Sequence, residues 1–472
     1  ACDWRNDRTR CSLRGRSMNR IALASLGCKT NQYGIDALAE WFRRHGFTIV
    51  DDKEPAEVYV LNTCTVTAEA ERKARQLLRR YRKLNSEALT VVCGCYAQRS
   101  DLREMADICI GTAGRSVLPQ LILGALEQTG SRGGLEKAAF QTDVYEELGV
   151  PAVPSETRAF LKVQDGCDNR CAYCAISLAR GRARSRSIKN IILEARALAA
   201  RGFSEFVLTG TNLNLYGSDF HGAEGAKNTR TADLADVINA VSQVEGVRRI
   251  RLGSLESTLM TEDFVERISG IRPLCPSFHL SLQSGSDRIL KAMNRRDSRA
   301  SYRDAVSRLR AAFPGAGITT DLIVGFPGET KEDFEETLAF SDEIGFLRIH
   351  VFRFSRRPGT LADKMPGQVP AAIAMERSEI LRAKAAELAV KAIADRMGQS
   401  FEVLVEQFDD KGRAEGYTPE YIFVKGVARR RRSDRDALGG DMPARGAIVP
   451  MKIVGSDGET AVAEVLSAEN AL

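Results

Sequence analysis

Residues 160–174, FLKVQDGCDNRCAYC, combine an apolar run with three closely spaced cysteines. The first residues form an apolar run typical of a buried β-strand, and the polar loop that follows contains Cys167, Cys171 and Cys174. Three thiolates at this spacing can bind three irons of a 4Fe-4S cube and leave the fourth iron without a protein ligand. That open iron can chelate S-adenosylmethionine, and an electron passed to the sulfonium then releases a 5'-deoxyadenosyl radical.

Structural zinc is the alternative for these three cysteines. Zinc prefers four ligands, and no fourth cysteine or histidine lies in the adjacent loop. The chain has only four histidines, none paired at a helical or finger-like spacing, so any large metal site depends on thiolate. The four are His45, His221, His279 and His350.

Short apolar runs alternate with helix-forming stretches from Phe160 onward. The six runs are FLKVQDG, FVLTG, RRIRLGS, SFHLSLQ, TTDLIVG and RIHVFRF. This alternation predicts a full or partial parallel β/α barrel over residues 154–395. The chemistry of such barrels lies at the carboxyl ends of the strands, where polar residues and glycines gather in this chain. By position, the candidate cofactor contacts are Gly210, Asn212, Glu256, Gln283, Arg295 and Asp321.

Residues 18–130 repeat the alternation on a smaller scale. The apolar runs IALASLG, EVYVLNTC and LTVVCGC precede stretches that favour helices, residues 35–45 and 68–84 among them. The pattern predicts a small parallel α/β domain. Residues 131–153 are interpreted as a linker. Residues 1–17, with five arginines and no apolar segment, are interpreted as an unstructured extension that precedes a native start at Met18.

A second set of three cysteines follows predicted strands of this first domain: Cys28 in SLGCKTNQYG, Cys64 in LNTCTV and Cys95 in CGCYAQR. The carboxyl ends of parallel strands meet at one edge of a sheet, so these thiols can converge as a second site. Eleven cysteines in a chain without an export signal favour metal binding over disulfides. Cys93, Cys109 and Cys275 are expected to be small buried hydrophobic residues.

Short strands replace the α/β pattern after a long helical stretch over residues 371–397. Runs such as FEVLVEQ and AIVPMKIVG predict a small all-β barrel of about five strands over residues 396–467. This part mixes aromatic and basic residues, a combination that can stack bases and bind phosphates. The alternatives are core packing for the aromatic residues and a solvated surface for the arginine run. The residues are Tyr417, Tyr421, Phe423, Lys425, Arg429, Arg430, Arg431 and Arg432.

The composition is that of a globular protein with a mildly basic surface. The formal net charge is +6, and hydrophobic residues make up 43% of the chain. No uninterrupted apolar run approaches the ~20 residues that a membrane-spanning helix requires. The charge is compatible with a polyanionic partner.

These motifs together resemble the methylthiotransferases of the radical S-adenosylmethionine superfamily. The resemblance covers nearly everything from Met18 onward and rests on GCKTNQY, NTC, GCYAQR, QDGCDNRCAYC with RGRARSR, LTGTNL, LQSGSDRIL and DLIVGFPGET, and the final barrel resembles a TRAM domain. GCKTNQY, HVFRFSRRPGT and EGYTPEYI are similar to the branch that modifies N6-threonylcarbamoyladenosine beside the anticodon. Sibling branches act on isopentenyladenosine in tRNA or on an aspartate of a ribosomal protein.

The resemblance implies a cytoplasmic enzyme that uses S-adenosylmethionine to add a 2-methylthio group to the anticodon stem-loop of tRNA. Cys167, Cys171 and Cys174 would hold the radical-generating 4Fe-4S cluster. A second 4Fe-4S cluster, whose open iron carries the inserted sulfur, would be held by Cys28, Cys64 and Cys95. An electron donor such as flavodoxin or ferredoxin is expected, and the sulfur donor is left open.

The chain departs from the family pattern where Ser177, Ser281 and Arg353 replace frequent prolines. The substrate therefore stays open between the threonylcarbamoyl and isopentenyl nucleosides. Arg353, Arg356 and Arg357 could supply the charge that a threonylcarbamoyl carboxylate requires, or they could bind phosphates or face water. A non-catalytic RNA-binding protein with structural zinc is the remaining alternative.

Overall fold

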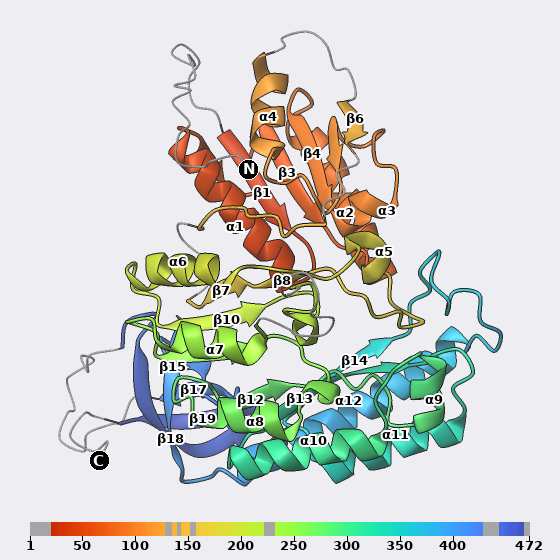
Figure 1. The fold of residues 1–472 in the computed structure, drawn as a ribbon, viewed down its shortest axis with the longest axis vertical. Helices are drawn as coiled ribbons and strands as arrows, with labels where there is room; N and C mark the ends of the chain where they lie inside the picture. The colour runs from red at the N-terminus through yellow and green to blue at the C-terminus, as the bar shows by residue number, and fades with distance from the viewer. Residues whose placement is uncertain are drawn as a thin grey trace, which may run out of the picture. The chain divides into compact units, whose positions relative to one another are not determined.

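The computed structural model describes residues 20–127, 135–138, 143–151, 157–220, 232–427 and 443–466. The chain divides into two units (Figure 1). The first unit comprises residues 1–155, 164–169 and 174–186, and the second comprises residues 156–163, 170–173 and 187–472. The predicted extension over residues 1–17 and the run Arg429, Arg430, Arg431 and Arg432 lie outside the described residues.

A six-stranded parallel sheet forms the centre of the first unit, as the sequence predicted. Its strand order is β2 (Thr48–Val50), β1 (Arg20–Ser25), β3 (Val58–Thr63), β4 (Leu89–Gly94), β5 (Ile108–Ile110) and β6 (Leu135–Ala138). The edge strand β6 comes from the segment interpreted as a linker. Alternate residues of a strand point to opposite faces, so Val58 and Val60 pack with α1 (Lys29–Arg44) and α4 (Leu118–Glu127).

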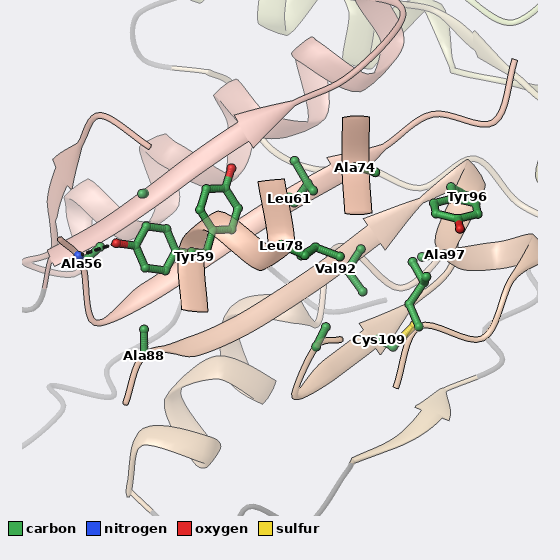
Figure 2. Packing of buried hydrophobic residues seen from close by; sticks show 14 residues of the cluster. Ala56, Tyr59, Leu61, Ala74, Leu78, Ala88, Val92, Tyr96, Ala97 and Cys109 are labelled. Atoms are coloured by element: carbon green, nitrogen blue, oxygen red, sulfur yellow. Dashed lines mark hydrogen bonds between the residues drawn. The ribbon is translucent and has the colours of Figure 1, made fainter. Parts of the chain in front are cut away.

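Tyr59 and Leu61 point to the other face, where they pack with α2 (Ala68–Leu84) (Figure 2). The rings of Tyr59 and Tyr81 stack with centroids 4.5 Å apart. The Tyr59 hydroxyl accepts a hydrogen bond from the Ala56 backbone nitrogen at 3.0 Å, so its polar end is satisfied inside the core. Cys109 belongs to this cluster and Cys93 to the one on the opposite face; both are buried hydrophobic residues, as expected.

Two three-stranded parallel sheets form the partial β/α barrel of the second unit (Figure 1). One has the order β11 (Arg249–Leu252), β10 (Glu205–Thr209) and β7 (Ala159–Lys162), and the other β12 (Ser277–His279), β13 (Gly317–Val324) and β14 (Arg348–Arg353). A parallel bridge between Leu255 and Leu280 connects the two sheets. The six strands match the six apolar runs of the sequence, and the partial barrel is confirmed.

Helices follow the strands of this barrel, as the alternating pattern predicted. They are α6 (Ile188–Ala199), α7 (Leu234–Ser242), α8 (Glu262–Ser269), α9 (Asp287–Ala292), α10 (Arg299–Ala312), α11 (Lys331–Ile344) and α12 (Ala371–Ala394). Two 3-10 helices, Leu213–Leu215 and Ser257–Leu259, lie after β10 and β11. Among the described residues, no helix is both long and apolar enough to cross a membrane.

A closed five-stranded barrel ends the second unit, consistent with a TRAM-like domain. Its strand order is β15 (Ser400–Phe408), β16 (Ala414–Tyr417), β17 (Phe423–Val427), β19 (Thr460–Val465) and β18 (Ile448–Asp457). Closure pairs every strand with two neighbours and leaves no open edge.

Buried ion pairs hold this small barrel against the first residues of β10 and β11. The Glu205 side chain is fully buried and accepts hydrogen bonds from Arg251 Nε at 2.6 Å and Arg249 Nη1 at 3.3 Å. The same two guanidinium groups also donate hydrogen bonds to backbone carbonyls of the small barrel. Arg251 Nη2 donates to the Thr418 carbonyl at 2.7 Å, and Arg249 Nη2 donates to the Glu402 carbonyl at 2.6 Å. The two barrels of the second unit therefore share one buried network of charges.

Tyr417 and Tyr421 belong to this interface. Their rings stack with centroids 4.5 Å apart, and the guanidiniums of Arg158 and Arg251 lie 5.6 and 5.0 Å from the centroid of the Tyr421 ring. Lys425 forms ion pairs with two carboxylates of its own barrel. These contacts support the packing alternative for the aromatic residues over base stacking.

Candidate functional site

The structure places Cys28, Cys64 and Cys95 at one edge of the first unit's sheet. Cys28 is the N-cap of α1 just beyond β1, Cys64 directly follows β3, and Cys95 begins α3 (Cys95–Arg99) directly after β4. The strands β1, β3 and β4 are neighbours in the sheet. Helix α1 begins earlier than the sequence indicated, at Lys29, and this early start positions Cys28 at its N-terminus.

Glycines precede two of these cysteines, and both have positive φ angles. Gly27 has φ +97°, and a Cβ atom there would lie 2.6 Å from Cys64 Sγ. Gly94 has φ +96°, and its Cβ would lie 2.6 Å from the Thr63 carbonyl oxygen. A residue with a side chain would be strained in both backbones and would also collide with the Cys64 loop. The two glycines therefore let the three cysteine-bearing turns approach one another.

Asn31 and Arg180 connect these turns. The Asn31 amide nitrogen donates to the carbonyls of Leu26 at 2.8 Å and Thr63 at 3.1 Å. Its amide oxygen accepts from Arg180 Nη2 at 2.7 Å. Arg180 ends α5 (Ile176–Arg180), and its Nη1 donates to Asp165 Oδ1 at 2.8 Å. One buried network thus joins the turn of Cys28 and the turn of Cys64 to the segment that follows Cys174.

Two buried guanidiniums give the thiol triad a cationic setting. Burial raises the pKa of Cys64 to about 11, with smaller contributions from Cys95 and Cys28, and Arg180 opposes the rise. Burial also raises the pKa of Cys95, again opposed by Arg180 and Arg115. Arg115 is 1% exposed and forms ion pairs with Glu146 at 3.5 Å and with Asp165 at 3.6 Å. Buried thiolates need nearby positive charge or a metal, so these residues fit an anionic iron-sulfur cluster.

The loop of Cys167, Cys171 and Cys174 contributes to both units. In the first unit, the strands β8 (Gln164–Asp165) and β9 (Arg184–Ser185) pair, and the Cys167 backbone nitrogen donates to the Gly181 carbonyl at 3.0 Å. The Ile176 backbone nitrogen lies 3.4 Å from Cys174 Sγ as a hydrogen-bond donor. Such N–H to sulfur bonds are one way in which proteins tune iron-sulfur clusters.

In the second unit, Cys171 belongs to a network that contains three of the six predicted cofactor contacts. Asn212 Nδ2 and Arg295 Nη1 both lie 3.4 Å from Glu256 Oε1. Arg295 also donates to the Ser281 carbonyl at 2.6 Å. Burial raises the pKa of Cys171, and the Arg295 guanidinium opposes that rise. Arg295 therefore links the carboxylate of Glu256 to a thiol of the predicted radical cluster.

The other three candidates lie outside that network. The Gln283 backbone nitrogen donates to the Asp321 carbonyl at 2.9 Å, and Gln283 has a strained φ of +79°. Gly210 follows β10 and is half-buried. No described contact of these residues tests binding of S-adenosylmethionine, so their role stays a prediction.

The arginines proposed for a threonylcarbamoyl pocket differ in their surroundings. Arg356 forms an ion pair with Asp363 at 3.1 Å, and Arg357 is buried, with its Nε donating to the Arg356 carbonyl at 2.8 Å. Arg353 is exposed at the end of β14. Of the three, Arg353 has the surroundings best suited to an external anion.

Sequence reasoning missed Asn31, Asp165, Arg180 and Arg115 as parts of the thiol site. Asn31 lies inside GCKTNQY, and Arg180 begins RGRARSR; both motifs indicate the family but predict no physical role for these two side chains. A polar residue three positions after a candidate cysteine was the available signal for Asn31. Arg115 carried no comparable signal in the sequence.

Comparisons with known proteins agree with this architecture. Residues 161–341 match the Radical SAM superfamily, and residues 20–110 match the Uncharacterized protein family UPF0004. Among solved structures, the chain resembles the radical S-adenosylmethionine methyltransferase TsrM from Kitasatospora setae, with TM-score 0.53 and 16% identity over 74% of this chain and 77% of that one. At this identity the likeness shows the fold. The fold and its cysteine loop define a radical S-adenosylmethionine enzyme.

Proteins of similar sequence identify the family more narrowly than the fold does. The chain is 37% identical to the threonylcarbamoyladenosine tRNA methylthiotransferase MtaB of Bacillus subtilis (strain 168) over 86% of this chain and 90% of that protein. It is 34% identical to the Thermotoga maritima MtaB, with 88% and 92% covered. A tRNA-2-methylthio-N(6)-dimethylallyladenosine synthase of Pelotomaculum thermopropionicum is 33% identical, with 93% and 96% covered. The chain belongs to the tRNA methylthiotransferase family of radical S-adenosylmethionine enzymes.

Proposed function

We propose that this enzyme converts N6-threonylcarbamoyladenosine beside the anticodon of tRNA to its 2-methylthio derivative and that it uses two 4Fe-4S clusters. The observation that carries the two-cluster proposal is the second thiol triad, Cys28, Cys64 and Cys95, at the ends of three neighbouring strands. The buried guanidiniums of Arg180 and Arg115 support it, because they offset the negative charge of a thiolate-bound cluster.

Each triad has a separate role in this proposal. When bound, the cluster of Cys167, Cys171 and Cys174 supplies the electron that cleaves S-adenosylmethionine to a 5'-deoxyadenosyl radical, and the second cluster supplies the sulfur. The chain's own residues position these groups: Asn31 and Arg180 fix the turns of the second triad, and Arg295 orders the surroundings of Cys171.

Zinc in place of the second cluster is disfavoured by the spacing of the thiols. One zinc ion with ligands at 2.3 Å holds its sulfurs about 3.8 Å apart. Among the described residues, the single group of three histidine, cysteine or carboxylate ligands whose atoms all lie within 4.8 Å of one another is a different one, described below. The sulfurs of Cys28, Cys64 and Cys95 do not all lie within 4.8 Å of one another.

The threonylcarbamoyl substrate is supported by the MtaB relatives, which are named threonylcarbamoyladenosine tRNA methylthiotransferases. The dimethylallyladenosine synthase, at 33% identity, makes an isopentenyl-type nucleoside the second candidate. Of the three candidate arginines, Arg353, exposed at the end of β14, is the best suited to contact a substrate carboxylate. The anticodon stem-loop as the docking site and flavodoxin or ferredoxin as the electron donor complete the proposal.

Iron counts and product analysis of single variants test the two clusters. Anaerobically reconstituted wild-type protein should bind about eight irons, and Cys64→Ala about four. Cys64→Ala should still produce 5'-deoxyadenosine but no methylthio product, whereas Cys167→Ala should lose both. Cys109→Ala, a change inside the hydrophobic core, is the control and should keep both clusters. Full product formation by Cys64→Ala would contradict the second cluster.

A competition experiment tests the substrate. Wild-type enzyme would receive equal amounts of tRNA with threonylcarbamoyladenosine and tRNA with isopentenyladenosine, and the nucleosides would be measured by mass spectrometry. We expect the threonylcarbamoyl nucleoside to gain the methylthio group first. Preferential modification of the isopentenyl tRNA would reassign the substrate and leave the cluster assignment intact.

A further inference from the structure

Three side chains from neighbouring strands of the partial barrel, none of them a cysteine, lie close together. His279 ends β12, Asp321 lies in β13, and His350 lies in β14. One ligand atom of each lies within 4.8 Å of the other two. The strand register brings them together, because His279 is paired with Thr319, and Asp321 is paired with His350.

All three point to the same side of the sheet. Phe278, the neighbour of His279, is fully buried and packs against Phe313, next to the helices. Successive side chains of a strand alternate between faces, so His279 points away from those helices, into the barrel. The same alternation separates Asp321 from the buried Leu322. The three groups therefore face the interior of the partial barrel.

The hydrogen bond between His279 and Thr319 orients the ring as a metal ligand would be oriented. Its Nδ1 lies 2.9 Å from Thr319 Oγ1, and its Nε2 lies 3.2 Å from Asp321 Oδ2. A histidine ligand usually uses its second ring nitrogen to hydrogen bond a neighbouring group, which fixes the coordinating nitrogen in place. Thr319 is buried and serves as that neighbour.

The spacing of the donor atoms is close to that of a coordination shell. Two ligands at about 2.1 Å from one ion are about 3.0 to 3.4 Å apart, and the 3.2 Å between His279 Nε2 and Asp321 Oδ2 falls in this range. The rings of His279 and His350 have centroids 5.8 Å apart. His350 is exposed, and one of its ring nitrogens lies within 4.8 Å of the ligand atoms of His279 and Asp321.

We propose that His279, Asp321 and His350 form a binding site for one divalent transition-metal ion. Two imidazoles and one carboxylate are a ligand set that suits Fe²⁺, Mn²⁺ or Zn²⁺ and leaves coordination positions open. The single negative charge of Asp321 favours a cation over an anionic group at this position. The side chains of His279 and Asp321 are 18% and 24% exposed, so an ion can enter from the interior of the barrel.

Mn²⁺ is the appropriate probe because it prefers oxygen and nitrogen ligands and competes poorly for the cysteine triads. The experiment titrates Mn²⁺ into anaerobically reconstituted full-length protein and follows the EPR signal of the free aqueous ion. Wild-type protein should remove one equivalent from solution. Asp321→Asn and His350→Gln should each weaken this binding by at least about tenfold, and Thr319→Val should weaken it less.

His45→Gln is the matched control. His45 is also exposed, but its ring stacks on Trp41 in the first unit, so its replacement should leave Mn²⁺ binding unchanged. Iron content and the circular dichroism spectrum identify any variant that fails to fold, and the second ligand variant then replaces it. Equal Mn²⁺ affinity in wild type, Asp321→Asn and His350→Gln would overturn the proposal, as would wild-type protein that binds no Mn²⁺ below millimolar concentration.

Discussion

Arg180 Nη2 donates a hydrogen bond to Asn31 Oδ1 at 2.7 Å, although 149 positions separate the two residues in the chain. The Asn31 side-chain amide nitrogen in turn donates hydrogen bonds to the carbonyls of Leu26 and Thr63, which flank two cysteine-bearing turns. The Arg180 guanidinium is buried. Loss of solvation alone would lower the pKa of Arg180, but Asp165, Cys95 and Cys28 together raise this pKa well above its usual value. Arg180 therefore stays charged beside the thiols.

Replacement of Arg180 by glutamine should destabilise the first unit. Asp165 and Asn31 would lose a buried partner, and the loss of one member of a buried ion pair costs about 3–5 kcal/mol of unfolding free energy. The measurement is urea denaturation followed by circular dichroism. Arg103→Gln, which removes an exposed ion pair to Asp101, is the control and should change stability little. Equal stability of Arg180→Gln and wild type would mean that this network is not required for folding.

Gly27→Ala should damage the thiol site more than a comparable change elsewhere. Its Cβ would meet Cys64 Sγ at 2.6 Å, and the backbone already has a positive φ. Gly46→Ala is the matched control, because Gly46 has φ +85° but nothing within 4 Å of its added Cβ. Both variants incur the backbone strain of about 1 kcal/mol, and we expect only Gly27→Ala to lose iron from the second triad. Iron and sulfide assays distinguish them; equal iron content would contradict the close approach of the two turns.

Glu205→Gln should make the second unit less stable in a pH-dependent way. Burial alone would raise the pKa of Glu205, but Arg251, Arg158 and Arg249 hold it below its usual value. Its ionised form therefore stabilises the folded state above the unfolded pKa of about 4.3, and this contribution is lost as pH falls through the lower folded pKa.

The difference in melting temperature between wild type and Glu205→Gln should be largest near pH 7 and shrink below about pH 4. Glu343→Gln, which removes an exposed partner of Arg303, should differ little from wild type at either pH. A difference that stays constant over this range would show that the charge of Glu205 is not its contribution.

Replacement of Arg429, Arg430, Arg431 and Arg432 by alanine should weaken tRNA binding without loss of 5'-deoxyadenosine formation. The expectation comes from the sequence, since arginine contacts with phosphates release counterions. The slope of log affinity against log salt should decrease by up to about 3 for four lost contacts. Filter binding at several salt concentrations measures it. An unchanged slope would assign the run to a solvated surface.

The repeating pattern of the chain was sufficient to predict its strands and layers. The six runs from Phe160 onward correspond to the six barrel strands, because each strand contributes buried apolar residues such as Phe206, Phe278 and Ile349 to the core. Helix α2 begins at the predicted Ala68, but α1 begins at Lys29, six positions before the predicted Ile35, because its first turn contains polar residues that bond to other loops. The apolar period alone does not reveal such a turn.

The thiol positions could be predicted from their place after strands, but the partners of the thiols could not. Arg180 and Asn31 meet only in the folded unit, so no local spacing connects them. The spacing of His279 and His350 is neither helical nor finger-like and predicts no metal site, yet strand register brings their ligand atoms within 4.8 Å of each other. Register in a parallel sheet depends on crossover connections, and these are not visible as a period in the sequence.

The interface between the small barrel and the β/α barrel makes truncation a poor way to study RNA binding. A chain cut before Ser400 would leave Arg249 and Arg251 without the Glu402 and Thr418 carbonyls that now accept their hydrogen bonds. Guanidinium groups without hydrogen-bond acceptors, together with an interface newly exposed to solvent, would lower the solubility of the remaining fragment and the cooperativity of its unfolding. Lost activity in such a fragment would thus report on damaged folding as much as on missing RNA contacts, whereas substitutions on the intact chain keep the two effects apart.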